Sequence, residues 1–374
     1  MAIRRQVRHG PIVMLMTGIV LLLFGTVSLG SASPKPPLAL TGVVISKQTF
    51  NPSSNEHIEV TYTLSRDAVV RLRIYDVDRR LVRTLAMGVK RRGGRNHVTW
   101  NGRDDVGRIV PNEAYFFTIE ATDADGNTAV YDPVTFSGGE FGDIRVGELD
   151  RASGTVTYQL SQPSRVLLRA GITGSAMLKT IVDWEPRAAG TVTEYWNGKD
   201  ENNLIDVLGR KHTMILSYMT LPENSVITYG NSKYDYRTYR ATLAPNRPLK
   251  PDRPMANCRR LSPHFSESRL TDRSFPVSVS FPERAAADVP KSAGRVIVRL
   301  DVDPKDRPVL EGRQFEVILF VDTVFHLEEE RGYLPLNAPI ELGPLPPGEH
   351  VITANVITFT DQIGVGSRKL ILTP

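Results

Sequence analysis

The stretch that decides the fold is Val60-Thr61-Tyr62-Thr63-Leu64-Ser65, which returns 96 positions later as Val156-Thr157-Tyr158-Gln159-Leu160-Ser161. Further blocks return at the same offset, namely Val70 with Leu72 and Arg73, then Val82 to Leu85, then Trp100 to Asp104. One constant shift covers every block without a gap. The sequence therefore indicates two copies of one module, each about as long as a small β-sandwich.

The first copy shows the period-two alternation that is typical of half-buried β-strands. Apolar and polar residues alternate over residues 58–64, 70–74 and 115–121. Such alternation places one set of side chains toward a core and the other toward water. Clusters of Gly, Pro, Asn and Asp separate these segments at the spacing of turns. The predicted class is therefore all-β, with the strands closed into sandwiches.

The second copy departs from the first after its Trp-Asn-Gly turn. Its apolar residues Met214, Leu216 and Tyr218 match Phe117, Ile119 and Ala121 only if the offset becomes 97. An offset of 96 would set them against the outward face of the first copy. A one-residue slip inverts the two faces of a strand. We therefore predict one inserted residue between Asp200 and Met214, in a turn or a bulge.

Six blocks of the first copy share an order and a spacing with a known family. They are Tyr62–Ser65, Val70–Asp76, Leu81–Leu85, Trp100–Gly107, Val110–Pro111 and Ala121–Asn127. This pattern resembles the FlgD-type immunoglobulin-like module, which is named after the flagellar hook-assembly protein and occurs widely in exported bacterial proteins. The resemblance implies an immunoglobulin-like sandwich and export. It implies no catalytic residues, and the scaffold segment of the hook protein has no counterpart here.

The expected domain organisation follows from these patterns. We predict a signal peptide or anchor at 1–33, the FlgD-type module at 40–137, its diverged repeat at 141–230, a linker at 231–274 and a third sandwich at 275–374. The third sandwich is expected to be immunoglobulin-like or fibronectin-III-like, because strands of period two resume after residue 275. The linker is rich in Pro, Tyr and Arg. Its tyrosines, among them Tyr236 and Tyr239, are expected in a strand that covers a neighbouring module; the alternative is stacking on nucleotides or sugars.

The N-terminal residues have the organisation of a secretory signal. Arg4, Arg5 and Arg8 precede an uncharged, mostly apolar run over residues 11–29, and small residues follow at 30–33. This order is that of a cleaved signal peptide. The alternative is an uncleaved anchor, because the run approaches the ~20 residues that span a bilayer. Either way we expect an exported protein, in the periplasm, on the cell surface or outside the cell.

Charge and cysteine content exclude some functions. The formal charge is +5, but three of the positive charges lie in the signal segment, which leaves 5 − 3 = +2. This is too little for a nucleic-acid-binding face. Cys258 is the single cysteine, so it forms no internal disulfide; it is either buried or able to pair with another chain.

Residue patterns for catalysis are missing from the sequence. The seven histidines do not form an HExxH motif, and no GxSxG motif is present. Acidic clusters at Asp123–Asn127 and Asp301–Asp306 offer oxygen ligands, but the first has the residues of a hairpin turn rather than of a calcium loop. We therefore predict no enzymatic activity, no cofactor and no metal.

The predicted function is a non-enzymatic structural or protein-interaction role in the bacterial envelope, with an envelope or extracellular protein as partner. Membrane contact is expected only through an uncleaved N-terminal segment. The loops predicted to touch a partner contain Asn101, Arg103, Asp104, Asp105, Asn197, Lys199 and Asp200. One alternative is a carbohydrate-binding or adhesive surface protein, which requires Trp100, Trp184 and Trp196 to be exposed in a row. Another is an enzyme of unrecognised type, with a pocket between the second and third modules.

Overall fold

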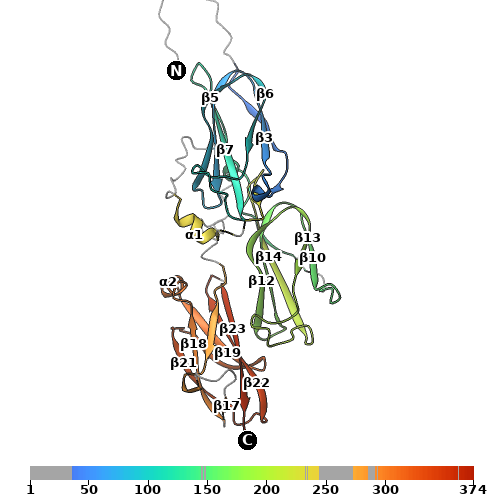
Figure 1. Ribbon diagram of the computed structural model, residues 1–374, viewed down its shortest axis with the longest axis vertical. Coiled ribbons are helices and arrows are strands. Elements are labelled where there is room, and N and C mark those ends of the chain that lie inside the picture. Colours follow the sequence, from blue (N-terminus) through green and yellow to red (C-terminus); the bar gives the residue numbers. More distant parts are fainter. Residues whose placement is uncertain are drawn as a thin grey trace, which may run out of the picture. The chain divides into compact units, whose positions relative to one another are not determined.

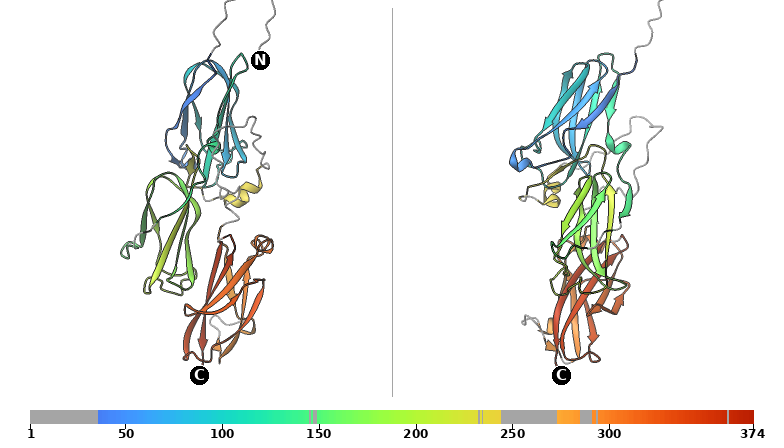
Figure 2. Two further views of the ribbon diagram at one scale, coloured as in Figure 1. Left: turned by 180° about the vertical axis from the view of Figure 1, so that it is seen from behind. Right: turned by 90° about the vertical axis from the view of Figure 1, so that its right-hand side faces the viewer.

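β-Strands dominate the structure of the chain (Figure 1). The computed structural model describes residues 36–144, 146, 149–231, 233, 235–243, 273–284, 291–292, 294–360 and 362–374. The predicted signal segment, Cys258 and the prolines between 245 and 254 lie outside the described residues. The described strands form three pairs of facing sheets, so the predicted all-β class and the three tandem sandwiches are confirmed (Figure 2).

The first sandwich begins at β1 and contains a three-stranded sheet in the order β1-β3-β6, which faces a larger sheet in the order β2-β15-β7-β4-β5, with β8 also paired to β7. Its elements are β1 (Leu40–Ile45), β2 (Thr49–Phe50), η1 (Pro52–Ser54), β3 (Ile58–Leu64), β4 (Ala68–Asp76), β5 (Leu81–Arg91), β6 (Gly94–Trp100), β7 (Ala114–Thr122), β8 (Thr128–Tyr131) and η2 (Pro133–Thr135). Alternate residues of β3, β4 and β7 point between the sheets and are buried. The predicted alternation therefore builds this core.

The second sandwich repeats this plan. Its elements are β9 (Phe141–Ile144), β10 (Thr155–Leu160), β11 (Ser164–Ile172), β12 (Met177–Arg187), β13 (Gly190–Tyr195) and β14 (His212–Thr220). Leu64 pairs with Gly94 in the first copy, and Leu160 pairs with Gly190 in the second. Both leucines are buried, as are Trp100 and Trp196. Equivalent residues thus occupy like environments, which supports a common origin of the two copies.

The predicted change of offset is confirmed by the strand register. Leu72 lies opposite Ile119 in the first copy, and Leu168 lies opposite Leu216 in the second. The first members of these pairs differ by 96 positions and the second by 97. The extra residue therefore lies between the paired strands, and the face of β14 that points into the core is preserved.

Turn hydrogen bonds locate the extra residue at Leu204. In both copies an aspartate carbonyl accepts an N–H three residues later, from Gly107 to Asp104 and from Asn203 to Asp200, each at 3.1 Å. The next bond differs, because Asp104 N–H donates to Arg108, four residues on, whereas Asp200 N–H donates to Ile205, five residues on. The second turn therefore accommodates Leu204 as its additional residue.

The order of strands in space differs between the copies in one respect. In the first copy β8 pairs with β7, and Ile119 lies opposite Tyr131. In the second copy β9 occupies the corresponding position, since Ile144 lies opposite Leu216. β9, the first strand of the second copy, thus takes the sheet position that β8, the last strand, holds in the first copy. The chain after β14 instead returns to the first sandwich as β15 (Val226–Thr228), which pairs with β7 and β2.

The start of the predicted linker is a helix and not the expected strand. Asp235 caps α1 (Tyr236–Ala241), because its carboxylate accepts the N–H of Thr238 at 2.9 Å. Tyr236 and Tyr239 are buried in the core of the first sandwich. These tyrosines therefore cover a neighbouring module, as expected, but they do so from a helix and not from a strand.

The third sandwich has its own core and contains sheets in the orders β16-β18-β21 and β17-β23-β22-β19-β20. Its elements are β16 (Val277–Ser280), η4 (Pro282–Arg284), β17 (Lys291–Ser292), β18 (Arg295–Val302), α2 (Arg307–Glu311), β19 (Phe315–Val321), β20 (Val324–Glu329), β21 (Leu336–Glu341), β22 (Gly348–Thr358) and β23 (Ile363–Leu372). Among the described helices, none is long and apolar enough to cross a bilayer.

Deleting Leu204 is expected to leave the second sandwich folded, because the first copy closes the same turn with one residue fewer. We expect a loss of about 1 kcal/mol or less in the free energy of unfolding. Deleting Ser217 from the middle of β14 is the matched control. That deletion exchanges the two faces of the remaining strand and should cost more than about 4 kcal/mol. Denaturant unfolding of both variants is the measurement, and equal losses would contradict the assignment of Leu204.

Candidate functional site

The first predicted contact loop is organised around a buried aspartate. Asp104 accepts the backbone N–H of Val106 at 3.1 Å and of Arg108 at 2.8 Å through Oδ1. Its Oδ2 forms an ion pair with Arg108 Nε at 2.8 Å. These bonds satisfy a carboxylate that would otherwise be costly to bury. Asp104 therefore shapes the loop from within and is not presented to solvent.

The second loop uses its equivalent aspartate in the same way. Asp200 is buried, and its Oδ1 accepts the N–H of Leu204 at 2.5 Å and of Ile205 at 2.9 Å. Asn197 accepts the N–H of Lys199 at 3.1 Å and donates to Asn203 Oδ1 at 2.9 Å. Both loops thus use a buried aspartate to accept backbone N–H groups of its own turn, which is typical of turn chemistry.

The other predicted loop residues are more accessible. Asn101, Asp105, Asn197 and Lys199 are exposed, and Arg103 is half-buried. Asp105 accepts the N–H of Thr84 at 3.1 Å, and Arg103 donates to the carbonyl of Gly107 at 2.8 Å. Their contact with an external partner stays a prediction.

Each loop also contacts another part of the chain. Tyr239 of α1 donates its hydroxyl to Asp104 Oδ2 at 3.3 Å, and the guanidinium carbon of Arg108 lies 5.2 Å from the centre of the Tyr239 ring. In the second loop, Asn202 accepts the N–H of Ser367 in β23 at 2.6 Å. The equivalent loops of the two copies thus both contact other parts of the chain.

The tryptophans do not form a sugar platform. Trp100, Trp184 and Trp196 are 0%, 5% and 2% exposed. The indole N–H of Trp100 donates to the carbonyl of Arg103 at 3.0 Å, and that of Trp196 donates to the carbonyl of Lys199 at 2.8 Å. Exposed aromatic rings are needed to stack on a sugar. The burial of all three rings removes the main support for the carbohydrate-binding alternative.

The acidic clusters serve as turns or ion pairs in this structure. Asp123 accepts the N–H of Asp125 at 3.0 Å and of Asn127 at 2.8 Å, as a hairpin turn requires. Asp301 pairs with Arg307, and Asp306 pairs with Arg237, both at 2.7 Å. Within the described residues, no group of three or more acidic, His or Cys side chains is arranged to hold a metal ion.

A buried ion pair lies where the first and second sandwiches meet, and the sequence patterns did not indicate it. Glu113 precedes β7 and is fully buried; its Oε1 lies 2.7 Å from Arg165 Nη2 of β11. Glu113 also accepts the N–H of Ala114 at 2.7 Å, and its Oε2 lies 3.3 Å from Arg273 Nη2. Burial lowers the pKa of the Arg165 guanidinium, but the charge and hydrogen bond of Glu113, with Tyr236 and Asp78, together raise the pKa above its usual value.

A β-bulge in β12 positions Arg165. Trp184 is the extra residue of this bulge and has a φ of 52°, and its carbonyl accepts Arg165 Nη1 at 2.7 Å. The equivalent residue of the first copy is Gly88, with a φ of 70°. Glycine adopts this conformation without strain, whereas a tryptophan there is strained. The second copy thus combines backbone strain with the burial of a large ring, which packs with Leu167, Met219 and Phe141 of the same sandwich.

The face of β11 that points away from the core of the second sandwich explains the change from Gly88 to Trp184. In the first copy Val69 and Arg71 lie on the exposed face of β4. Their equivalents in the second copy are Arg165 and Leu167, and both are buried. The offset comparison itself carried this signal, because the exposed Arg71 corresponds to an apolar residue.

Two further acidic residues lie beside the junction at the end of β4. Burial raises the pKa of Asp76 to about 7, although its Oδ1 accepts the N–H of Arg80 at 2.8 Å. Burial also raises the pKa of Asp78, which forms an ion pair with Arg240 and accepts the hydroxyl of Tyr236 at 3.3 Å. The sequence indicated only a turn at these positions. Structural networks of this kind shift pKa values as active sites do, so the shifts alone do not indicate catalysis.

Comparison with known families assigns the first module. Residues 48–125 match the family model described as "FlgD Ig-like domain", which confirms the resemblance seen in the sequence. A search of curated proteins gives no match.

Three solved structures align with most of this chain, but at low TM-scores. The fibronectin(III)-like modules of Clostridium thermocellum CbhA align at 9% identity over 90% of this chain and 94% of theirs, with a TM-score of 0.19. A tetra-tandem repeat from the extending region of a large adhesion protein aligns at 11% identity over 90% and 75%, with a TM-score of 0.19. Escherichia coli alpha-2-macroglobulin aligns at 10% identity over 90% and 35%, with a TM-score of 0.20. At such TM-scores these likenesses carry no weight for function.

Replacing Asp76 should remove a pH dependence of stability. The unfolded carboxyl titrates near 3.8 and the folded one near 7, so its contribution to stability is complete below pH 3.8 and is lost as the pH rises through 7. Asp76→Asn keeps the acceptor for Arg80 and cannot ionise. When the pH is raised from 5 to 8, we expect the free energy of unfolding of the parent to fall by about 2 kcal/mol more than that of the variant. Unfolding at both pH values measures this, and parallel pH profiles would refute it.

Removing one partner of the buried ion pair should destabilise the chain more than removing both. Arg165→Leu leaves Glu113 buried without its main counter-charge, and we expect a loss of about 3 kcal/mol. Adding Glu113→Gln removes that uncompensated charge, so the double variant should recover part of the loss. A double-mutant cycle by denaturant unfolding measures the coupling. Additive losses would show that the pair does not act as a unit.

Proposed function

We propose that the chain is an exported, non-enzymatic protein of the bacterial envelope that binds another protein through its immunoglobulin-like modules. Export rests on the signal-like residues 1–33 and on the FlgD-type module at 48–125. The modules present strand edges and end loops, and these are the surfaces through which sandwiches commonly bind partners.

The observation that carries this proposal is the junction at Glu113 and Arg165. Its ionisable groups are paired with one another, and Asp104 and Asp200 are used inside their loops. These side chains therefore stabilise the scaffold. An enzyme would direct such groups toward a substrate cavity. The chain leaves the second sandwich after β14 and pairs as β15 with β7 of the first, and this return favours a fixed presentation of their edges and loops.

The test has two readouts on the full-length chain expressed in its native cell type. Fractionation should place the protein in the envelope or outside the cell, and retention in the cytoplasm would overturn the export part of the proposal. Cross-linking should join the chain to one protein at constant stoichiometry. A chain that forms no stoichiometric complex would overturn the interaction part.

Exposed loop residues offer a sharper version of the cross-linking experiment. Asn101→Arg with Lys199→Glu changes both predicted contact loops and leaves the buried aspartates intact. We expect this variant to weaken the complex about tenfold or more if these loops belong to the interface. Glu311→Lys is the control, because it changes an exposed residue of α2 in the third sandwich. Equal cross-linking of both variants would exclude the loops from the interface.

A further inference from the structure

One strand edge of the third sandwich combines open backbone groups, apolar side chains and negative charge. β20 is the last strand of its sheet and pairs only with β19 within the described residues. Val321 and Val324 close the hairpin across Asp322 and Thr323, whose φ values are 51° and 71°. The register shifts between Leu319 and Phe320, so His326 is the extra residue of a β-bulge in β20. Backbone groups alternate in direction on either side of this bulge, and those of Phe325 and Glu328 therefore both point away from β19. They are available to another strand.

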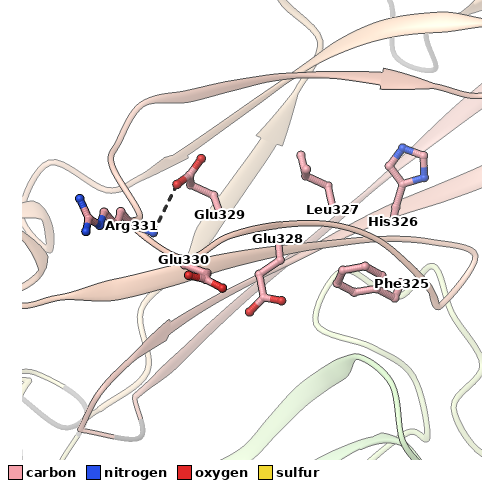
Figure 3. Close-up of a pocket in the computed structure, with 7 residues that line it drawn as sticks. All are labelled: Phe325, His326, Leu327, Glu328, Glu329, Glu330 and Arg331. Atoms are coloured by element: carbon pink, nitrogen blue, oxygen red, sulfur yellow. Dashed lines mark hydrogen bonds between the residues drawn. The ribbon is translucent and has the colours of Figure 1, made fainter.

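The first half of this edge is apolar and exposed. Val324 is 69% exposed and Phe325 is 58% exposed. Both side chains are exposed among the described residues, and burial against a partner would be energetically favourable for each of them. A shallow, widely open pocket of about 620 Å³ lies beside residues 325–331 (Figure 3).

The second half of the edge is acidic. Glu328, Glu329 and Glu330 follow one another, and none of them forms an ion pair with a described residue. Glu329 accepts only the backbone N–H of Arg331, at 3.3 Å. Figure 3 shows Phe325, Glu328 and Glu330 on one side of the strand and Leu327 and Glu329 on the other. One side therefore presents an aromatic ring followed by two carboxylates.

This charge pattern distinguishes between possible occupants. Charged residues on an edge strand protect it against pairing with other copies of the same chain. In a symmetric antiparallel pair of two β20 strands, the carboxylates of one copy would lie opposite Phe325 or opposite the carboxylates of the other copy, and neither neighbour compensates their charge. A strand with basic residues would instead gain opposite-charge pairs across the ladder.

We propose that β20 accepts an extended segment of a partner protein as an additional antiparallel strand, with basic residues opposite Glu328 and Glu330 and an apolar residue opposite Phe325. This inference rests on the proposed interaction function and specifies one surface for it. Backbone hydrogen bonds supply the affinity in strand addition, and the alternating side chains supply the specificity.

The experiment uses the full chain and a synthetic peptide, Lys-Thr-Lys-Thr-Leu-Thr-Val, which carries its basic residues before the apolar ones as antiparallel pairing requires. A labelled peptide should bind in a fluorescence anisotropy titration and bind more weakly as salt is added. A peptide with glutamate in place of lysine should have an affinity that is lower by a factor of about ten or more. Absence of binding by the lysine peptide at millimolar concentration overturns the proposal.

Two controls separate strand addition from attraction between charges. The same lysine peptide, N-methylated at alternate residues, keeps its charges and loses backbone donors; unchanged binding would overturn strand addition. Glu328→Lys with Glu330→Lys should weaken binding about tenfold. Glu283→Lys with Glu311→Lys makes the same charge change at exposed residues elsewhere in the third sandwich and should leave binding unchanged.

Two other outcomes assign the failure to its source. If the charge-reversed variants bind the peptide alike, the β20 assignment falls. If cross-linking in cells still yields a stoichiometric complex, the interaction function stands and another surface serves it. Sedimentation of the chain alone should show a monomer at the concentrations of the titration. A dimer that is lost on Glu328→Lys would identify a second copy as the occupant and overturn the proposal.

Discussion

The ion pair between Glu113 and Arg165 is the interaction on which the arrangement of the first two sandwiches depends. Each partner lies in a different copy, and neither can remain charged in a buried place without the other. The strained bulge at Trp184 and the ordering of Arg273 are consistent with this requirement, since both supply contacts to the same two side chains. A contact between modules that buries charge in this way tolerates little relative movement.

Duplication followed by divergence accounts for the difference between the copies. The residues that point between the sheets kept their character, because a core closes only if both sheets remain apolar. The outward residues were free to change. In the second copy Leu167 and Trp184 became part of a small buried cluster with Met219. One face of the duplicated sandwich thus became buried, and its Arg165 pairs with Glu113 beside β7, while Val69 and Arg71 at the equivalent positions of the first copy stayed exposed.

Local patterns explain which features the sequence could predict. The repeat, the alternation and the shift to 97 positions gave the all-β class, the paired faces and the inserted residue, because side-chain period and register are local properties. The exchange of β9 for β8 and the return of β15 could not be read in this way. They depend on pairing between strands that are distant in sequence, and short strands carry little information about their partner. The helix α1 was missed because its six residues show too few turns for a helical period.

The candidate loops show the same limit for function. Asn101 to Gly107 was chosen for its polar residues, yet Asp104 uses its charge inside the turn. A polar side chain that organises a turn and one that binds a partner look alike in sequence, since both favour Asp and Asn. Glu113 and Arg165 are 52 positions apart, and only the folded chain brings them together.

The position of β15 has a consequence for biosynthesis. β7 leaves the ribosome more than a hundred residues before its neighbour β15, so the nascent first sandwich has an incomplete sheet throughout translation of the second. The sheet of the first sandwich can therefore be completed only after the second sandwich and β15 have been synthesised. A fragment cut at the family boundary would lack both the returning strand and the helix that covers its core.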